Sequence, residues 1–434
     1  MHKKMIILSH DAMVWEDLDY LRQLPTFGNL IRHGAQICTL RSIYPTITYP
    51  VHASIISGTY PEHHGVINNE LPEIGALSSP WHWFADANRS KTLFKAAKEA
   101  GLTTAAVFWP VSGNDPDVDH LVAEYWSQSD HDDLEDVFRR SGSSEPVMEA
   151  VVKKNLHLLR GHERKHPQAD EFVIQAACDL IRAFKPDLLA VHPAAIDGAR
   201  HVSGLFSGQV NESLRHTERW TRMIIDATRD AGVYEQTDFI NLSDHGQLDI
   251  KRTLHPNVIL RDHGLIRTDE QENFLDWDAF CKSAALSAHV YLRDPEDNAL
   301  LERVHRLLLH LRDEGIYGIS EVFTREEIRE KEHLDGDFSF VIESDGYTSF
   351  GNDWRRPIVR PFDLADYRFG RATHGHLPDK GPQPTLIATG PSFKPGAVVQ
   401  RRPIVDVAPT LALALGLELP DADGQPVKAL LRED

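Results

Sequence analysis

Short apolar runs alternate with longer amphipathic stretches along most of the chain. Four of the runs are typical of buried strands, because they are short, mostly apolar and followed by polar residues. They cover Met5–Leu8, Thr104–Phe108, Leu188–Val191 and Asp238–Leu242, and Pro384–Thr389 is expected to add a strand later in the chain. Strands that alternate with helical stretches predict an α/β fold with a mostly parallel central sheet flanked by helices.

The stretches between these runs have the apolar spacing that predicts helices, and several end at a glycine. The helix predicted at Val51–Ser57 has Pro50 at its first position and Gly58 just past its end. The other predicted helices are Leu18–His33, Leu93–Ala100, Phe172–Phe184, Asn211–Ala231 and Ile404–Leu415.

The pattern changes after about Arg252, and the order of the next segments predicts a β-α-β-type unit beside the main sheet. These segments are Ala288–Leu292, Asp297–Arg312, Ile319–Phe323 and Phe338–Glu343. We therefore divide the chain into a core at residues 1–250, a smaller inserted α+β lobe at 251–372, and a second part of the core at 373–434. The polar, acidic and histidine-rich segment 115–171 is expected to form a lid over one side of a site.

Aspartate and histidine residues cluster just after the apolar runs. Because the carboxyl ends of parallel strands meet at one edge of a sheet, we expect these side chains to lie together. Both residue types are good zinc ligands. The candidates are Asp11, the pair Asp197 and His201, the run Asp244-His245-Gly246, and His374.

The spacing of these residues suits shared metal ions. Asp197 and His201 are four residues apart, which places both on one face of a helix. His376 lies two residues after His374, and either imidazole could bind; we favour His374 and expect His376 to lie behind the ligands or to face solvent. Three carboxylates, three imidazoles and one hydroxyl fit two ions in one site, most simply two Zn²⁺, with other divalent metals possible.

The hydroxyl is expected from the segment Tyr44–Pro50, which contains Thr46 and Thr48. Thr48 precedes a predicted helix, whose free N–H groups and positive dipole end favour a bound anion. A threonine hydroxyl is a poor nucleophile at its ordinary pKa, and a bound metal is one way to lower that pKa. The alternative is that Thr48 only caps the helix, and the two roles are compatible.

The net charge and the cysteine content narrow the range of possible functions further. The net charge of −19 over 434 residues argues against a nucleic-acid polymer as partner, although metal ions can invert the local field for a small anion. Cys38, Cys178 and Cys281 are too widely spaced to suggest a disulfide framework or a thiolate zinc site. The first apolar run is too short for a signal peptide or a membrane span, so we expect a cytoplasmic protein.

The chain resembles the nucleotide pyrophosphatase/phosphodiesterase family of the alkaline phosphatase superfamily. The residues from Tyr44 through Asn69 resemble that family's nucleophile segment almost throughout, and Phe108-Trp109-Pro110 is similar to another family element. The candidate ligands occur in the family's order, and Ile404–Gly424 is similar to the superfamily's C-terminal helix and turn. An alkaline-phosphatase-like core is therefore expected.

The resemblance implies a role for each candidate. Thr48 would be the nucleophile, and Asn69 would bind a phosphoryl oxygen together with the backbone N–H of Thr48. One zinc ion would be held by Asp11, Thr48, Asp244 and His245. The other would be held by Asp197, His201 and His374. Trp81, Trp83, Phe84 and Trp109 lie in segments expected to flank the site, and Trp109 is the candidate for stacking on the substrate, with core packing as its alternative.

We therefore predict a two-zinc hydrolase of phosphodiester or pyrophosphate bonds in small substrates, with a covalent phosphothreonine intermediate. One alternative is a phosphonate hydrolase, which would need cationic side chains to hold a carboxylate. Another is a phosphomonoesterase, for which Arg200 and Lys91 are the candidates to neutralise the extra phosphate charge. A non-catalytic binding protein is a third alternative, which the complete ligand set disfavours.

Overall fold

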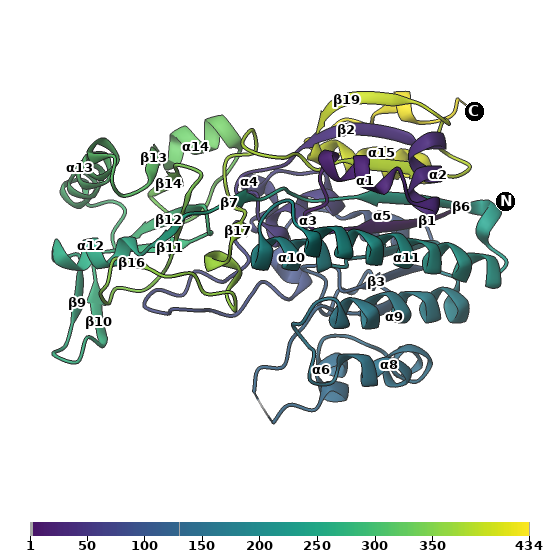
Figure 1. Ribbon diagram of the computed structural model, residues 1–434, viewed down its shortest axis with the longest axis horizontal. Helices are drawn as coiled ribbons and strands as arrows, with labels where there is room; N and C mark the ends of the chain where they lie inside the picture. The colour runs from purple at the N-terminus through teal and green to yellow at the C-terminus, as the bar shows by residue number, and fades with distance from the viewer. Residues whose placement is uncertain (1–2, 130, 434) are drawn as a thin grey trace.

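The computed structural model describes residues 3–129 and 131–433. Its centre is an eight-stranded sheet with the order β19-β2-β18-β6-β1-β5-β3-β4 (Figure 1). The strands are β1 (Lys4–Ser9), β2 (Ala35–Arg41), β3 (Thr104–Val107), β4 (His120–Val122), β5 (Leu188–Val191), β6 (Thr237–Leu242), β18 (Leu386–Thr389) and β19 (Val398–Pro403). Within this sheet β18 alone runs antiparallel to its neighbours, so the predicted α/β fold is confirmed.

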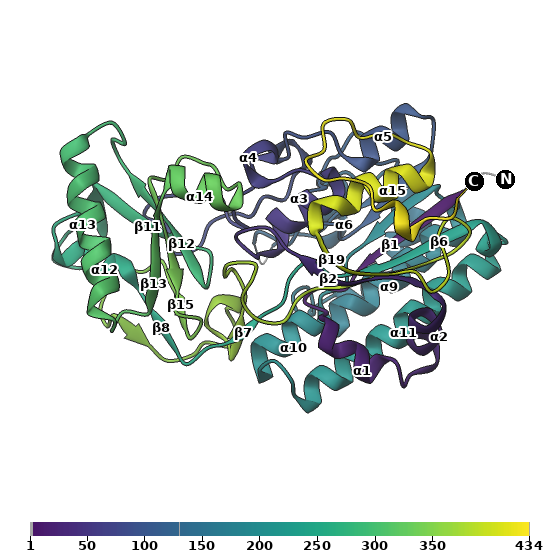
Figure 2. The same ribbon diagram turned by 90° about the horizontal axis from the view of Figure 1, so that it is seen from above.

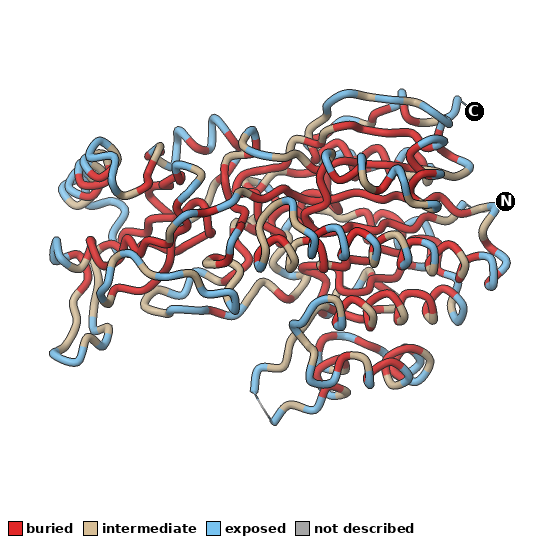
Figure 3. Tube along the Cα trace, in the orientation of Figure 1, coloured by how far each residue is buried: buried red, intermediate tan, exposed pale blue. Residues whose placement is uncertain are grey.

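Helices cover both faces of this sheet, because its strands are apolar on both sides. Met5 and Ile7 of β1 enter one hydrophobic core and Ile6 and Leu8 enter the other, as the two-residue period of a strand requires. Figure 2 shows the two helix layers, and Figure 3 shows the buried strands between them. The first face holds α3 (Thr48–Ser57), α5 (Leu93–Glu99) and α15 (Val407–Leu415), and the second holds α8 (Lys153–Leu159), α9 (Gln168–Phe184) and α11 (Gly208–Asp230).

The prediction of one helix over Leu18–His33 is wrong. The chain forms two helices there, α1 (Leu18–Leu21) and α2 (Pro25–His33). Proline has no backbone N–H and disfavours helical geometry in the residue before it, so Leu24 is extended and Pro25 starts a new helix.

The helix predicted at Val51–Ser57 begins earlier, at Thr48. Pro50 is its third residue rather than its first. This position is tolerated because the first N–H groups of a helix have no partner inside it. Thr48 itself therefore stands at the helix N-terminus.

A second sheet lies beside the first, with the order β11-β12-β14-β13 (Figure 1). Its strands are β11 (Ala279–Ser283), β12 (Ser287–Leu292), β13 (Ile319–Thr324) and β14 (Phe340–Ser344). The helix α13 (Asn298–Glu314) connects β12 to β13, but β14 lies between these strands and pairs antiparallel with both. The smaller elements around this sheet are α12 (Pro256–Asp262), α14 (Arg325–Glu332), β8 (Arg252–Leu254), β9 (Ile266–Thr268), β10 (Phe274–Trp277), β15 (Thr348–Phe350) and β16 (Val359–Arg360).

A short ladder marks where the chain leaves the first sheet and returns to it. The strand β7 (Leu248–Asp249) pairs antiparallel with β17 (Ala372–Thr373). Leu248 lies opposite Thr373. The ladder therefore brings the residue after Thr373, which is His374, close to the loop that follows β6.

The segment 115–171 folds largely into helices on one side of the main sheet (Figure 1). It contains β4, α6 (Leu134–Arg140), α7 (Glu145–Val147), a turn of π-helix at Met148–Val152, and α8. The remaining helices of the core are α4 (Pro61–His64) and α10 (Ala195–Ser203).

The three cysteines are buried and unpaired within the described ranges, as their spacing led us to expect. In residues 3–129 and 131–433, no helix combines the length and the apolar character that crossing a membrane requires.

Candidate active site

The site is built at the carboxyl ends of three adjacent strands. Asp11 lies just beyond β1, His192 directly follows β5, and Asp244-His245 lies just beyond β6. These three strands pair in parallel, so their ends open on the same edge of the sheet. The helices α3 and α10 and the loop after β17 bring Thr48, Asp197, His201 and His374 to this edge.

The first group of side chains surrounds the imidazole of His245. Its Nε2 lies 3.2 Å from Thr48 Oγ1, 3.2 Å from Asp244 Oδ2 and 3.5 Å from Asp11 Oδ1. Ligand atoms of Asp11, Asp244 and His245 all lie within 4.8 Å of one another. The sequence-predicted ligands of one zinc ion, Asp11, Thr48, Asp244 and His245, are therefore together and buried.

The second group gathers on α10. Asp197 Oδ2 lies 3.0 Å from His201 Nε2, and Asp197 Oδ1 lies 3.8 Å from His374 Nε2. His201 Nδ1 donates to the backbone carbonyl of Ala372 at 2.7 Å, which leaves Nε2 as the free ligand atom. The predicted second ligand set, Asp197, His201 and His374, is thus also brought together.

The two groups form one continuous centre. The rings of His245 and His374 stack with centroids 4.2 Å apart. Ligand atoms of Asp197, His245 and His374 also lie within 4.8 Å of one another, so His245 belongs to both groups by distance.

The electrostatics of this centre suit bound cations. Burial lowers the pKa of His245 to about 3 and raises the pKa of Asp11 well above its usual range, with Asp197 and Asp244 adding to the rise. Burial also raises the pKa of Asp244. Within the described part of the chain, Asp11 Oδ1, Asp244 Oδ2, His245 Nδ1 and His374 Nδ1 are buried without a hydrogen-bond partner. Crowded carboxylates and neutral imidazoles with unsatisfied atoms are a donor set that fits divalent metals.

The hydroxyl of Thr48 is available for chemistry, whereas that of Thr46 is not. Thr48 is the first residue of α3 and is 7% exposed. Thr46 Oγ1 donates to the carbonyl of His376 at 2.8 Å and accepts from the N–H of Gly375 at 3.1 Å. Of the two candidate hydroxyls, the geometry therefore favours that of Thr48.

Asn69 lies beside this helix start. Its side-chain oxygen accepts a hydrogen bond from the backbone N–H of Tyr49 at 2.9 Å, which leaves the amide nitrogen as a donor.

His376 was expected to lie behind the ligands or to face solvent. It is buried, so the second of these positions does not hold. Its Nδ1 lies 2.9 Å from the carbonyl of Leu377.

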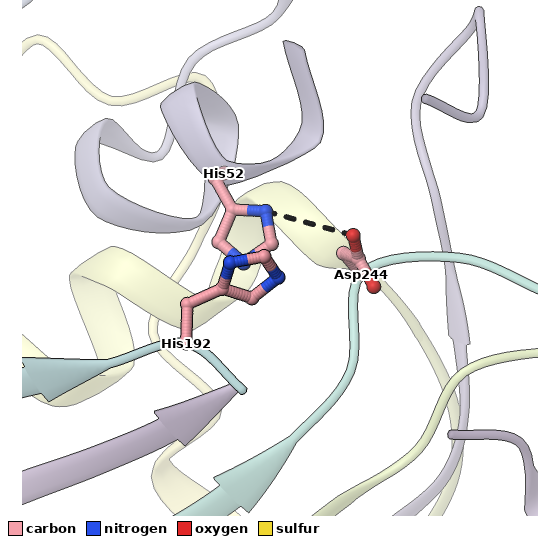
Figure 4. Close-up of side chains that lie close together, drawn as sticks. All are labelled: His52, His192 and Asp244. Carbon is pink, nitrogen blue, oxygen red and sulfur yellow. Dashed lines mark ion pairs between the residues drawn. The ribbon is translucent and has the colours of Figure 1, made fainter. Parts of the chain in front are cut away.

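Two histidines of the site were missed by the sequence analysis. His52 Nδ1 donates to the carbonyl of Thr48 at 2.8 Å, and its Nε2 accepts from Ser9 Oγ at 2.9 Å. His192 Nε2 lies 3.2 Å from Asp11 Oδ2. Figure 4 shows both rings next to Asp244, whose Oδ2 is 3.5 Å from His52 Nδ1.

These two histidines orient ligands rather than add a third metal position. Ligand atoms of His52, His192 and Asp244 are close enough to hold an ion, but both nitrogens of His52 already take part in hydrogen bonds. The strand-end rule could have found His192, which directly follows the run Leu188–Val191. His52 lies four residues after Thr48, which places both on one face of the predicted helix, and this spacing could have pointed to His52.

A cavity of about 740 Å³ is lined by Thr48 and by four of the metal-ligand candidates, which are Asp11, Asp197, His201 and His374. The segment 115–171 forms part of its wall, through residues that include Glu124, Trp126, Arg164 and His166. The segment before β17 forms another part, through Tyr367 and Arg368. The ring of Tyr367 stacks on His374, with centroids 5.5 Å apart.

Trp109 does not line this cavity. It is 1% exposed and packs edge-on against His52, with ring centroids 4.8 Å apart. Phe108 has a positive φ of 54°, which interrupts the strand alternation, and it is Phe108 that lines the cavity. Trp81 also lines the cavity, and Trp83 stacks behind it at 5.5 Å.

Arg200 and Lys91 also lie outside the cavity wall. Arg200 is fully buried and pairs with Asp17 at 2.5 Å, while Lys91 pairs with Glu99 at 2.6 Å. The cations that line the cavity are Arg164, Lys165 and Arg368. The sequence analysis did not single out these three residues, because Arg164 and Lys165 lie in the segment 115–171 and Arg368 lies six residues before His374, all outside the candidate ligand motifs.

Comparison with known proteins identifies the family of this chain. The family model described as type I phosphodiesterase / nucleotide pyrophosphatase matches residues 5–375. Mouse (Mus musculus) ectonucleotide pyrophosphatase/phosphodiesterase family member 1 is 26% identical over 247 residues, which are 55% of this chain and 23% of the relative. Venom phosphodiesterase 2 of Crotalus adamanteus is 25% identical over 251 residues, which are 54% of this chain and 25% of the relative. The match thus spans about a quarter of the length of these curated relatives.

Solved structures share the fold. Human ectonucleotide pyrophosphatase/phosphodiesterase 5 aligns with a TM-score of 0.69 at 16% identity, covering 99% of this chain and 100% of that one. An inactive form of the murine protein in complex with AMP aligns with a TM-score of 0.67 at 16% identity, with 100% of both chains covered. The family match confirms the resemblance seen in the sequence: the chain belongs to the type I phosphodiesterase / nucleotide pyrophosphatase family.

Proposed function

We propose that this protein hydrolyses phosphodiester or phosphoanhydride bonds of small substrates, with Thr48 as the nucleophile. The observation that carries the proposal is the position of the Thr48 hydroxyl. It stands at a helix N-terminus, in the cavity wall, 3.2 Å from His245, which has ligand atoms within 4.8 Å of those of Asp11, Asp197 and Asp244. A helix N-terminus favours an anion such as a phosphoryl group.

Two divalent metal ions, most simply Zn²⁺, would complete the site. Asp11, Thr48, Asp244 and His245 would hold one, and Asp197, His201 and His374 the other. When bound, such ions lower the pKa of a hydroxyl and neutralise charge on the attacking and leaving oxygens. Their support here is the close grouping of carboxylate and imidazole ligand atoms, with Asp11 Oδ1 and Asp244 Oδ2 left without a hydrogen-bond partner among the described residues.

The chain's own residues then perform the transfer. Thr48 Oγ1 attacks phosphorus, a Thr48–phosphoryl bond forms, and the bond to the leaving oxygen breaks with departure of the alcohol or phosphate. A water molecule then breaks the Thr48–phosphoryl bond and regenerates the hydroxyl. The side-chain amide of Asn69 donates to a non-bridging phosphoryl oxygen, and His52 holds the Thr48 carbonyl so that the hydroxyl keeps its place.

The cavity wall supports an organic ester with an aromatic group. Trp81, Trp126, Phe108 and Tyr367 offer aromatic faces, and bases stack well on such faces. A related structure holds AMP, which supports a nucleotide-type substrate for this chain too. Arg164 and Lys165 favour a substrate with a further anionic group, which keeps phosphonates with a carboxylate as a second candidate class, whereas Arg368 is already paired with Asp366 and Glu70.

Replacement of Thr48 tests the proposal. We expect Thr48→Ala to keep the fold, since the N-cap of α3 is Ile47 and the Thr48 hydroxyl does not cap the helix, and to lose hydrolysis of bis-(p-nitrophenyl) phosphate by several orders of magnitude. Acid quench of the wild-type enzyme during turnover should trap a phosphorylated peptide that maps to Thr48. A chelator should abolish the activity and added zinc should restore it.

Thr46→Ala is the matched control, because its hydroxyl is engaged with His376 and Gly375. It should keep most of the activity. Near-normal turnover in Thr48→Ala would show that another group attacks, and the phosphothreonine mechanism would then be abandoned. A substrate panel of diesters, monoesters, dinucleotides and phosphonoacetate would set the substrate class.

A further inference from the structure

One buried amide joins two of the ligand segments. Gln247 follows Asp244-His245-Gly246 and is fully buried. Its Nε2 lies 2.5 Å from Asp197 Oδ1 and 3.3 Å from the backbone carbonyl of Asp197. The loop after β6 is thereby tied to α10 at the carboxylate itself.

The two oxygens of Asp197 have different partners. Oδ2 faces His201 Nε2 at 3.0 Å, and Oδ1 accepts from Gln247. The orientation of the amide follows from chemistry, since its oxygen at 2.5 Å from a carboxylate oxygen would be repelled. The donor fixes one carboxylate oxygen and leaves the other directed at His201.

Glutamine suits this place better than other residues of its size. An apolar side chain would leave the half-buried Asp197 oxygen without its donor, and a glutamate would put a second negative charge beside it. The oxygen Oε1 of Gln247 is buried without a partner among the residues that the structure describes, which carries an energetic cost. The hydrogen bond that Gln247 donates to Asp197 explains why a polar amide occupies this buried position.

We propose that Gln247 is a positioning residue that sets the orientation of the Asp197 carboxylate and thereby the affinity of the metal position formed by Asp197, His201 and His374. The inference rests on the proposed function, because it presupposes that this centre binds divalent metal. Outer partners of metal ligands typically change metal affinity about 10- to 100-fold when they are removed.

Zinc titration of the full chain against a competing chelator tests this, without reference to turnover. In Gln247→Met, which has nearly the same volume but no amide, one of two zinc equivalents should bind about 10- to 100-fold more weakly and the other unchanged. Excess zinc should restore activity. Gln247→Asn, whose amide is one methylene too short to reach Asp197, should show the same loss and serves if the methionine variant does not fold.

Gln36→Met is the matched control. Gln36 is also a buried glutamine, and its Nε2 donates to the carbonyl of Ile31 at 2.6 Å, in a strand (β2) that β18 separates from β6. It should lower the melting temperature of the metal-free protein without changing zinc affinity. If Gln247→Met or Gln247→Asn binds both equivalents as the wild type does, Gln247 is only structural and the inference fails. If the wild-type protein binds no divalent metal, both the proposed function and the inference about Gln247 fail.

Discussion

The role that a residue can play at this site depends on which of its groups are not already engaged by neighbouring residues. Thr48 and Thr46 look alike in the sequence, yet only Thr48 has an uncommitted place in the cavity wall, because the hydroxyl of Thr46 bonds to the loop after His374. The same reasoning separates two tryptophans. Trp109 is enclosed behind His52, while Trp81 presents its ring to the cavity.

Trp81 is therefore where base stacking should be tested. We expect Trp81→Ala to raise KM for a nucleotide diester about 5- to 100-fold, equivalent to about 1–3 kcal/mol of stacking, and to change KM little for a diester with small alkyl groups. Phe84→Leu is the control, since Phe84 packs on Tyr125 and does not line the cavity. An equal rise for both substrates would exclude stacking on Trp81.

At the scale of elements, the start of α3 carries the chemistry. Three attachments hold it: Tyr49 N–H donates to Asn69, His52 donates to the Thr48 carbonyl, and Ser9 donates to His52. Asn69 thus has two roles, since its oxygen fixes the helix start and its nitrogen is free for the phosphoryl group.

Two substitutions of Asn69 separate these roles. Asn69→Asp keeps an oxygen for Tyr49 N–H but removes the amide donor, so we expect near-normal stability and a fall in kcat of about 100-fold or more, in line with the loss of one oxyanion donor. Asn69→Ala removes both the oxygen that accepts from Tyr49 N–H and the amide donor, so it should also lower the free energy of unfolding by about 1–3 kcal/mol. Thermal unfolding and steady-state kinetics measure the two effects. Equal stability losses in both variants would count against the structural role of the Asn69 oxygen.

At the scale of the molecule, the second sheet holds the loops of the site. Glu343 of β14 is fully buried and accepts from the Tyr44 hydroxyl at 2.9 Å, from Leu377 N–H at 3.0 Å and from Lys380 Nζ at 2.7 Å. One of these partners precedes Thr48 and the other two follow His374. The backbone of His374 is also tied to the second sheet region, through Leu286 N–H at 3.0 Å.

Glu343 should make stability depend on pH. Burial raises the pKa of Glu343 from its usual 4.5 to about 7, and Lys380 opposes this rise. Because the folded pKa lies above the unfolded one, the contribution of Glu343 to stability is complete below about pH 4.5 and is lost as the pH rises through 7. Relative to Glu343→Gln, the wild-type free energy of unfolding should fall by up to about 3 kcal/mol between pH 4.5 and 8.

Urea unfolding in a chelating buffer measures this difference without a contribution from bound metal. Glu302→Gln is the control, because the Glu302 side chain is 72% exposed on α13. A difference between wild type and Glu343→Gln that stays constant with pH would refute the expectation.

The sequence by itself determined the fold class and the ligand candidates, because both depend on local patterns. Apolar runs predict the strands, and strands in a parallel sheet must place the residues that follow them at one edge, which is why Asp11 and Asp244-His245 could be grouped before the structure was known. The edge strand β19 escaped prediction because its exposed side chains are largely polar. The break at Pro25 was in the sequence and was overlooked.

Tertiary structure alone decided what depends on contacts between distant segments. His374 reaches His245 because β7 pairs with β17, and Gly375 crosses beside the second sheet with φ of 91°, where a Cβ atom would lie 1.9 Å from the carbonyl oxygen of Ala284. Gln247 meets Asp197, and Trp81 rather than Trp109 faces the cavity, only because helices and loops pack at particular angles. Local patterns specify which residues follow a strand, whereas the partners of a buried polar group are set by packing across the whole chain.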